Sequence, residues 1–443
     1  MKRELLEKEF NTSKNIIVTG DVSVGKTTKI MFPLVEKMLE NNESMLIIDS
    51  KEEYINRYYN DFKSKGYNTI ILNFRDLDKS DGWNPIEHPY NLYKKGSIDK
   101  SLEYVEKLGK TMFYESGSVD PFWSLTSADF FTGVSLGLFE DGKEEEVNLN
   151  SVNLMFNGID RKFGTSDYIT HYFNSKKPTS QAYMCASTTF LAPKDTKGSI
   201  LSVARQRLRT YVSREKLSVL MSKTTFNYEE IANKPTVIFV IARDENKYLN
   251  TIAAMFVEQL FAILIDLKVS NKFNFVLDNF DIVERYNDLV DMLGSGISRN
   301  IKFVIGTRSL EKMLEDYGMY IKKLCNVISL SNDTIEINNE QIANEYEEIE
   351  NKVSNINYPT LNNREIKLFD LEKFIQDKKK DDIVKSMENM GVQPKPLDKP
   401  SIDALINKID DKLAELDAEE KMAKAKENNT SIKSEFSQFK ISE

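Results

Sequence analysis

Gly20-Asp21-Val22-Ser23-Val24-Gly25-Lys26-Thr27 is the stretch that decides the fold of this chain, because it fits the phosphate-binding loop G-x-x-x-x-G-K-[ST]. Residues 15–19 before it are typical of a short buried strand, and the residues from Thr28 onward are typical of a helix opening. In that order, backbone N–H groups and the helix N-terminus cradle phosphates. The pattern assigns the β and γ phosphates to Lys26 and a Mg²⁺ ion to the Thr27 hydroxyl. Residues 20–28 therefore predict a nucleotide site.

The composition of the chain excludes several classes of protein. It has 443 residues, a formal net charge of −9 and 40% hydrophobic residues, which predict two or three domains and no chain-wide attraction for nucleic acid. Two cysteines, Cys185 and Cys325, favour a reduced, cytoplasmic compartment, and two histidines argue against a His-based metal site. No uninterrupted apolar run reaches 18 residues, so we expect no membrane span.

Strands and helices alternate in two separated parts of the chain. We expect helices at 52–65 and 249–267, among strands at 44–49, 68–74, 236–241, 273–278, 301–305 and 327–330. This alternation predicts an α/β fold with a doubly wound, mostly parallel sheet. Residues 98–222 instead show helical periodicity, which predicts an inserted all-helical domain.

Four parts follow from these patterns. Residues 1–97 form the first part of a nucleotide-binding domain, 98–222 the helical insertion, and 223–377 the second part of the nucleotide-binding domain. Residues 378–443 are predicted to be a charged linker and an amphipathic tail helix, because apolar residues recur at helical spacing between Ile402 and Leu416. A helix packed on its own domain and a docking element for a partner remain alternatives for this tail.

Asp278 is the expected partner of the loop, because it ends a predicted buried strand and would hold Mg²⁺ through water. Asn279 follows it where many P-loop ATPases have a glutamate. An amide can position water but cannot accept its proton at neutral pH. Hydrolysis is therefore slow, or Asp281 or Glu284 substitutes as the base, or the protein mainly binds nucleotide; the sequence leaves these three open.

Several further segments, taken together with the loop, resemble the type IV coupling proteins of conjugative and secretion systems (TraG-type). They are Asp49–Glu53, Trp83-Asn84-Pro85-Ile86, Asp120-Pro121-Phe122-Trp123, Leu277-Asp278, Ser298-Arg299-Asn300-Ile301 and a helix from Ser309 that ends in Tyr317-Gly318. The resemblance covers roughly residues 14–340 and rests on the order and spacing of the pieces.

The resemblance implies a RecA-like P-loop NTPase with an inserted all-helical domain, which forms a homo-oligomer that is usually a hexamer in the family. It implies ATP and Mg²⁺ as cofactors, and DNA or a relaxase–DNA complex delivered to type IV secretion machinery. The expected location is the cytoplasm, or the inner face of the cell membrane through partners. It also implies an ATP site between subunits, completed by an arginine in trans. Arg299 is the first candidate and Arg308 the second, although either could equally be a structural ion-pair partner.

Three features depart from the family pattern. The chain begins almost directly at the nucleotide-binding domain, where the family usually has transmembrane helices, which puts stable membrane anchoring in doubt. Asn279 stands where the family has Glu, and Arg308 where it has a Gln thought to sense nucleotide. These two put normal turnover in doubt.

The best local feature for DNA contact is a run of basic residues in the helical insertion, with Arg205, Arg207 and Arg209 at its centre and Lys194, Lys197 and Arg214 around them. Phosphate contacts made there would be independent of sequence and sensitive to salt. The alternative is that these basic residues form an ordinary solvated helix face without a role in DNA binding.

Three functions compete for this chain. The first is a coupling-protein-like motor ATPase acting on DNA or a nucleoprotein. The second is a nucleotide-binding adaptor or scaffold with weak or no hydrolysis, because Asn279 replaces the usual glutamate. The third is a ring ATPase of the FtsK/HerA type outside conjugation. The helical insertion and the Trp83-Asn84-Pro85 segment favour the first two.

Overall fold

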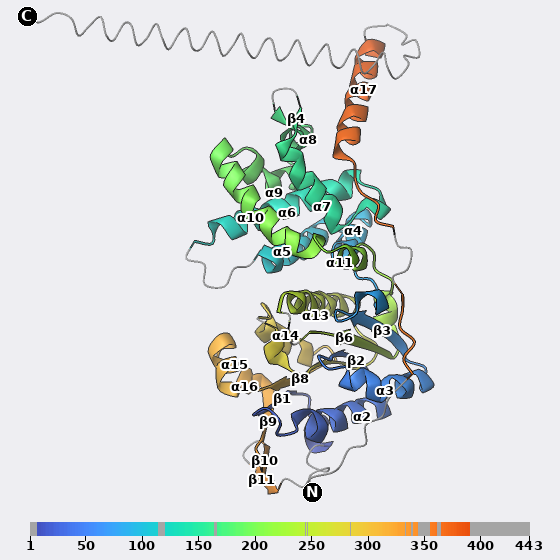
Figure 1. Ribbon diagram of the computed structural model, residues 1–443, viewed down its shortest axis with the longest axis vertical. Coiled ribbons are helices and arrows are strands. Elements are labelled where there is room, and N and C mark those ends of the chain that lie inside the picture. The colour runs from blue at the N-terminus through green and yellow to red at the C-terminus, as the bar shows by residue number, and fades with distance from the viewer. Residues whose placement is uncertain are drawn as a thin grey trace, which may run out of the picture. The chain divides into compact units, whose positions relative to one another are not determined.

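The computed structural model describes residues 7–113, 120–163, 166–243, 245, 247–283, 285–332, 334–337, 340–343, 355–360 and 365–389 (Figure 1). The chain divides into two compact units. The α/β unit comprises residues 1–114, 147–150 and 207–367, and the helical unit comprises residues 115–146, 151–206 and 368–443. Each unit is built from segments that are separated in sequence.

The α/β unit is built on one sheet, whose described strands are nine in number and run in the order β11-β10-β9-β1-β8-β7-β2-β6-β3. Seven of them pair in parallel, whereas β10 and β11 form an antiparallel pair at one edge. The bounds are β1 Asn15–Gly20, β2 Ser44–Ile48, β3 Asn68–Asn73, β6 Thr236–Ile241, β7 Phe273–Leu277, β8 Ile301–Thr307, β9 Cys325–Leu330, β10 Thr334–Ile337 and β11 Glu340–Ala343. The mostly parallel sheet was predicted, but the β10–β11 edge was not.

Helices cover both faces of this sheet, as its continuous apolar strands require. On one face, α2 (Phe32–Glu40) and α3 (Glu53–Ser64) share a hydrophobic core with alternate residues of β1, β2 and β6. On the other, Phe261 of α13 (Lys247–Leu267) packs on Phe275 and Phe303, with ring centroids 6.1 and 5.7 Å away. The other helices of the unit are α4 Glu87–Lys94, α5 Ile98–Phe113, α11 Glu215–Leu220, α12 Tyr228–Asn233, α14 Leu289–Ile297, α15 Leu310–Tyr317 and α16 Ile321–Leu324.

Within α13, residues Leu249–Leu267 are long and apolar enough to cross a membrane by length and composition. The sequence predicted this helix, and polar residues such as Gln259 keep its uninterrupted apolar runs below 18 residues. In the structure 78% of the stretch is buried inside the protein, which is the environment of a core helix.

The helical unit is organised around α6 (Phe122–Asp141), whose residues 126–128 and 130–139 are all buried. A Cβ on Gly133 would lie 2.5 Å from the backbone nitrogen of Ala186, so glycine is what lets α9 (Gln181–Phe190) approach so closely. This unit also contains α8 Tyr168–Asn174, α17 Leu371–Asn389, a short strand pair (β4 Lys162–Phe163 and β5 Ser166–Asp167), and most of α7 (Leu149–Asn157) and α10 (Lys194–Val212), whose residues 149–150 and 207–212 group with the α/β unit. The strand pair corrects the expectation of a purely helical insertion.

The boundaries predicted at 98 and 222 differ from the observed units. Helix α5 belongs to the α/β unit, where the Ser101 hydroxyl donates to the carbonyl of Pro89 at 2.7 Å and the Tyr104 hydroxyl donates to Asp266 at 2.7 Å. Helix α11 belongs to it as well. Helical periodicity marks α5 correctly as a helix but carries no information about which core receives its apolar face.

The tail also differs from the prediction. Helix α17 continues across the expected linker start at residue 378 and groups with the helical unit, where Phe374 contacts Tyr172 with ring centroids 5.9 Å apart. The predicted tail helix between Ile402 and Leu416 lies outside the described residues.

Candidate nucleotide site

The phosphate-binding loop leaves the sheet at the carboxyl end of β1, as predicted. A Cβ on Gly20 would lie 2.5 Å from the carbonyl oxygen of Leu330 in the neighbouring strand β9, so a larger residue does not fit there. Gly25 and Ser23 both have left-handed backbones, with φ of +87° and +70°. Thr27–Met31 then form a π-helical turn that leads into α2. The loop residues Asp21, Val22 and Ser23 are exposed, whereas Val24 is buried and anchors the turn.

Lys26 lies across the loop that carries it. Its ammonium donates to the carbonyl of Gly20 at 2.6 Å and to that of Asp21 at 2.9 Å. Burial lowers the pKa of Lys26, while the nearby carboxylates of Asp278 and Asp281 raise it. The lysine therefore stands among the groups expected to surround a polyphosphate. Thr28, the last predicted loop residue, donates its hydroxyl back to the carbonyl of Gly25 at 3.3 Å.

Asp278 and Thr27 meet at this loop. The Thr27 hydroxyl donates to Oδ2 of Asp278 at 2.7 Å, although the two residues are 251 positions apart in the sequence. Strand β8 lies between β1 and β7, and its Gly306 leaves the space that the carboxylate occupies, since a Cβ there would lie 2.6 Å from Oδ1 of Asp278. A hydroxyl and a carboxylate side by side are hard oxygen ligands of the kind that Mg²⁺ takes together with substrate phosphates. Among the described residues no group of three or more His, Cys, Asp or Glu side chains forms a metal cage.

Tyr54 is a site residue that the sequence reasoning missed. Its hydroxyl donates to Oδ2 of Asp278 at 2.8 Å, and its ring is buried against Phe32 with centroids 5.0 Å apart. Asp49 positions this tyrosine by accepting hydrogen bonds from the backbone N–H groups of Glu53, Tyr54 and Ile55 at the start of α3. Burial raises the pKa of Asp49 to about 7. The motif at 49–53 is therefore structural, and it holds the helix whose tyrosine reaches Asp278.

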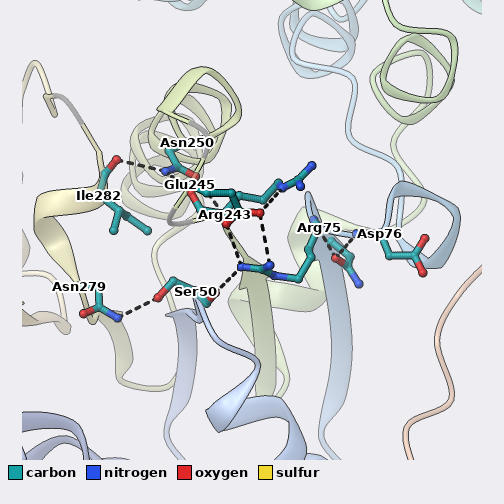
Figure 2. A network of polar contacts seen from close by, with 9 residues as sticks. Ser50, Arg75, Asp76, Arg243, Glu245, Asn250, Asn279 and Ile282 are labelled. Atoms are coloured by element: carbon teal, nitrogen blue, oxygen red, sulfur yellow. Dashed lines mark hydrogen bonds and ion pairs between the residues drawn. The ribbon is translucent and has the colours of Figure 1, made fainter.

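Asn279 and Asp281 follow Asp278 and point to different neighbours. The Asn279 side-chain nitrogen donates to the hydroxyl oxygen of Ser50 at 2.8 Å (Figure 2). Asp281 accepts from the Thr307 hydroxyl at 2.9 Å and from the backbone N–H of Arg308 at 2.7 Å. The other substitute base, Glu284, lies outside the described residues.

The two arginine candidates lie at opposite ends of β8. Arg308 follows the carboxyl end of the strand and is close enough to Lys26 to lower its pKa. Arg299 precedes the amino end and donates to the carbonyl of Ser295 at 2.8 Å. Seven residues of strand span about 20 Å, so Arg299 is remote from the phosphate loop of its own chain. The structure thus brings Arg308, but not Arg299, to the site within one subunit.

The Trp83-Asn84-Pro85 segment is a packing device. Trp83 is fully buried, its indole N–H donates to Gln259 of α13 at 3.0 Å, and Gln259 donates in turn to the carbonyl of Pro85 at 2.7 Å. The segment fixes α13 through Gln259. Among the interactions of the described residues, none joins this segment to the phosphate loop.

The basic run in α10 is partly neutralised. Arg205 pairs with Asp160 at 2.9 Å and donates to the carbonyl of Phe156, while Lys197 pairs with Asp167 at 3.3 Å. Arg209 is exposed and Arg207 is half-buried. Arg205, one of the three residues at the centre of the predicted basic run, therefore serves the packing of its own unit.

Together, the strand order, the loop and the Thr27–Asp278 pair define a RecA-like P-loop NTPase. A family model for the conjugative DNA transfer proteins of the type IV secretory system matches residues 2–365. The chain therefore belongs to this family, as the resemblance in sequence implied.

Solved structures of the plasmid coupling protein TrwB share the fold. The trigonal form of TrwBdeltaN70 with sulphate has a TM-score of 0.53 and 14% identity, covering 72% of this chain and 71% of that chain. TrwB with ADP and Mg²⁺ has a TM-score of 0.51 and 14% identity, covering 74% of this chain and 77% of that one. TrwB with the ATP analogue ADPNP has a TM-score of 0.51 and 13% identity, covering 74% and 78%. No curated protein sequence matches the chain.

Proposed function

We propose that this protein is a coupling ATPase that binds ATP·Mg²⁺ at residues 20–28 and Asp278 and uses it in conjugative DNA transfer. The observation that carries the proposal is the 2.7 Å contact between Thr27 and Asp278 beside Lys26. Membership of the family supports the transfer role, and the complexes of TrwB with ADP, Mg²⁺ and ADPNP support the cofactors.

Different residues of the site would bind the phosphates and the Mg²⁺ ion. Backbone N–H groups of the loop would hold the phosphates, and Lys26 would exchange its bonds to the loop carbonyls for phosphate oxygens. Thr27 and Asp278 would hold Mg²⁺, which neutralises charge on the phosphate oxygens when bound. Tyr54 and Gly306 keep the Asp278 carboxylate in place.

Turnover depends on how the attacking water is oriented. The oxygen of the Asn279 amide can accept a hydrogen bond from water but cannot remove its proton. Hydrolysis then resembles the water-positioning type, in which an amide orients the nucleophile. The second candidate function, a nucleotide-gated adaptor with little turnover, is favoured by the same residue.

The assembly and its partners complete the proposal. We infer a homo-oligomeric ring, in which Arg299, remote from its own site, would serve the site of a neighbouring subunit. Arg308 would sense the nucleotide in its own subunit. Arg209 is the best candidate for a DNA phosphate contact because it is exposed, whereas Arg207 is half-buried and Arg205 pairs with Asp160. The protein would act in the cytoplasm or at the inner face of the membrane, with DNA or a relaxase–DNA complex as substrate and secretion machinery as partner.

Steady-state ATP hydrolysis with and without single-stranded and double-stranded DNA tests this function, with Lys26→Ala as the site variant. DNA-stimulated turnover that is lost in Lys26→Ala supports the motor. Nucleotide binding without turnover under all conditions supports the adaptor. Unchanged nucleotide affinity and rate in Lys26→Ala would remove the site assignment itself.

A further inference from the structure

The side chain of Asn279 is held on the side of β7 that faces away from the phosphate loop. Asn279 has a left-handed backbone, with φ of +55°, and its N–H donates to Oδ1 of Asp278 at 2.9 Å. Its side-chain nitrogen donates to the Ser50 hydroxyl at 2.8 Å (Figure 2). Ser50 follows β2, and β2 borders β7 on the edge opposite β8 and β1. The hydrogen bond therefore draws the amide away from the strand that carries the loop.

The backbone of Ser50 is itself fixed by a hydrogen bond from Arg75. Its carbonyl oxygen accepts a hydrogen bond from the Arg75 guanidinium at 2.9 Å. Arg75 follows β3 and pairs with Glu245 at 3.4 Å, and Glu245 accepts from Nε of Arg243 at 2.9 Å (Figure 2). Ser50 is 2% exposed, whereas the Glu245 side chain is 48% exposed. The chain of contacts thus runs from the buried site to the surface.

Asn250 closes these contacts into a ring. It is fully buried, and its side-chain nitrogen donates to the carbonyl of Arg243 at 2.7 Å and to that of Ile282 at 3.1 Å. The N–H of Ile282 donates to the carbonyl of Asn279 at 3.0 Å. The ring returns to the residue at which it began and joins the carboxyl ends of β2, β3, β6 and β7. Both the backbone and the side chain of Asn279 are fixed by it.

We propose that Ser50 is a positioning residue that restrains Asn279 in a retracted orientation, so that each turnover requires this hydrogen bond to break. The inference rests on the proposed ATPase function and adds a regulator to the same site. Arg75 is the outer part of the restraint, because it fixes the backbone of Ser50. An anionic group that drew Arg75 away from Ser50 would loosen Asn279. The restraint could therefore be released by binding at the protein surface near Arg75.

The test compares kcat and nucleotide affinity in the full chain with Ser50→Ala and Ser44→Ala. Ser44 is the matched control, since it lies at the other end of β2, is also 2% exposed and makes comparable single hydrogen bonds to Lys234 and Thr236. Loss of one neutral hydrogen bond corresponds to a rate change of about two- to tenfold. Ser50→Ala should raise kcat by this factor with unchanged affinity for a fluorescent ATP analogue, and Ser44→Ala should leave both unchanged. Arg75→Ala should shift kcat in the same direction.

A double-mutant cycle with Asn279→Ala separates restraint from general loosening. In the Asn279→Ala background, Ser50→Ala should produce no further gain, because the restrained amide is already absent. A gain that persists in that background overturns the proposal, as does an equal or lower kcat in Ser50→Ala alone. If neither wild type nor Ser50→Ala turns over while both bind the ATP analogue, the restraint is refuted and nucleotide binding stands. If the wild type does not bind the analogue, the proposed function itself fails.

Discussion

Gly306→Ala would test the geometry of the proposed magnesium site without removing any of its polar groups. The added Cβ would lie 2.6 Å from Oδ1 of Asp278, against 3.4 Å for ordinary contact, so the carboxylate must move by about 0.8 Å. A movement of this size is enough to take the 2.7 Å bond from Thr27 beyond the 3.2 Å limit of a good hydrogen bond. The 2.8 Å bond from Tyr54 depends on the same oxygen.

The expected effect falls mainly on Mg²⁺. Hydrogen bonds to a charged group contribute about 1.5–3 kcal/mol each, and overpacking costs about 1–3 kcal/mol, so the loss of one such bond together with overpacking should lower the free energy of unfolding by roughly 2.5–6 kcal/mol. Mg²⁺ tolerates little departure from octahedral geometry. The Mg²⁺ concentration at the midpoint for nucleotide binding and hydrolysis should therefore rise at least tenfold. Nucleotide binding in EDTA should change much less.

The assay is a titration of nucleotide affinity with Mg²⁺, accompanied by urea unfolding. Gly294→Ala is the matched control, because this glycine also lies in the α/β unit and its added Cβ would meet only Leu324, at 3.9 Å. In a helix this change should be neutral or stabilising. An unaltered Mg²⁺ midpoint in Gly306→Ala would refute the placement of Asp278 as the magnesium carboxylate.

Three other changes give separate expectations. Asn279→Glu should raise turnover, because a carboxylate can accept the proton of water and an amide cannot; a flat rate would move the base elsewhere. Trp83→Ala should lower the free energy of unfolding by about 3–5 kcal/mol through loss of a fully buried ring and its bond to Gln259, and a loss under 1 kcal/mol would contradict the packing role. The pKa of Asp49 is about 7 in the fold and about 3.8 when unfolded, so the folded state binds more protons between these values. Wild type should therefore lose stability relative to Asp49→Asn as pH rises from 5 to 7, and parallel pH curves would contradict the raised pKa.

The sequence by itself determined the class of fold and predicted the centre of the candidate site. Mostly apolar runs such as 273–277 are buried on both faces of a parallel sheet. Their high apolar content is therefore enough to predict them as strands. The loop at 20–27 and Asp278 are local signals, since each depends on residues adjacent in the chain. Period and spacing therefore sufficed for the doubly wound sheet, and they predicted Lys26, Thr27 and Asp278 as the residues of a nucleotide site.

Only the tertiary structure decided which distant side chains meet. Tyr54 reaches Asp278 because α3 is capped by Asp49, and Gly306 matters because β8 separates β1 from β7; no local pattern encodes either contact. The assignment of α5 to the α/β unit and the placement of Arg299 far from its own phosphate loop are likewise products of packing and strand direction. Amphipathic spacing predicts that one face of a helix is buried. Which element packs against that face depends on the tertiary structure of the whole chain.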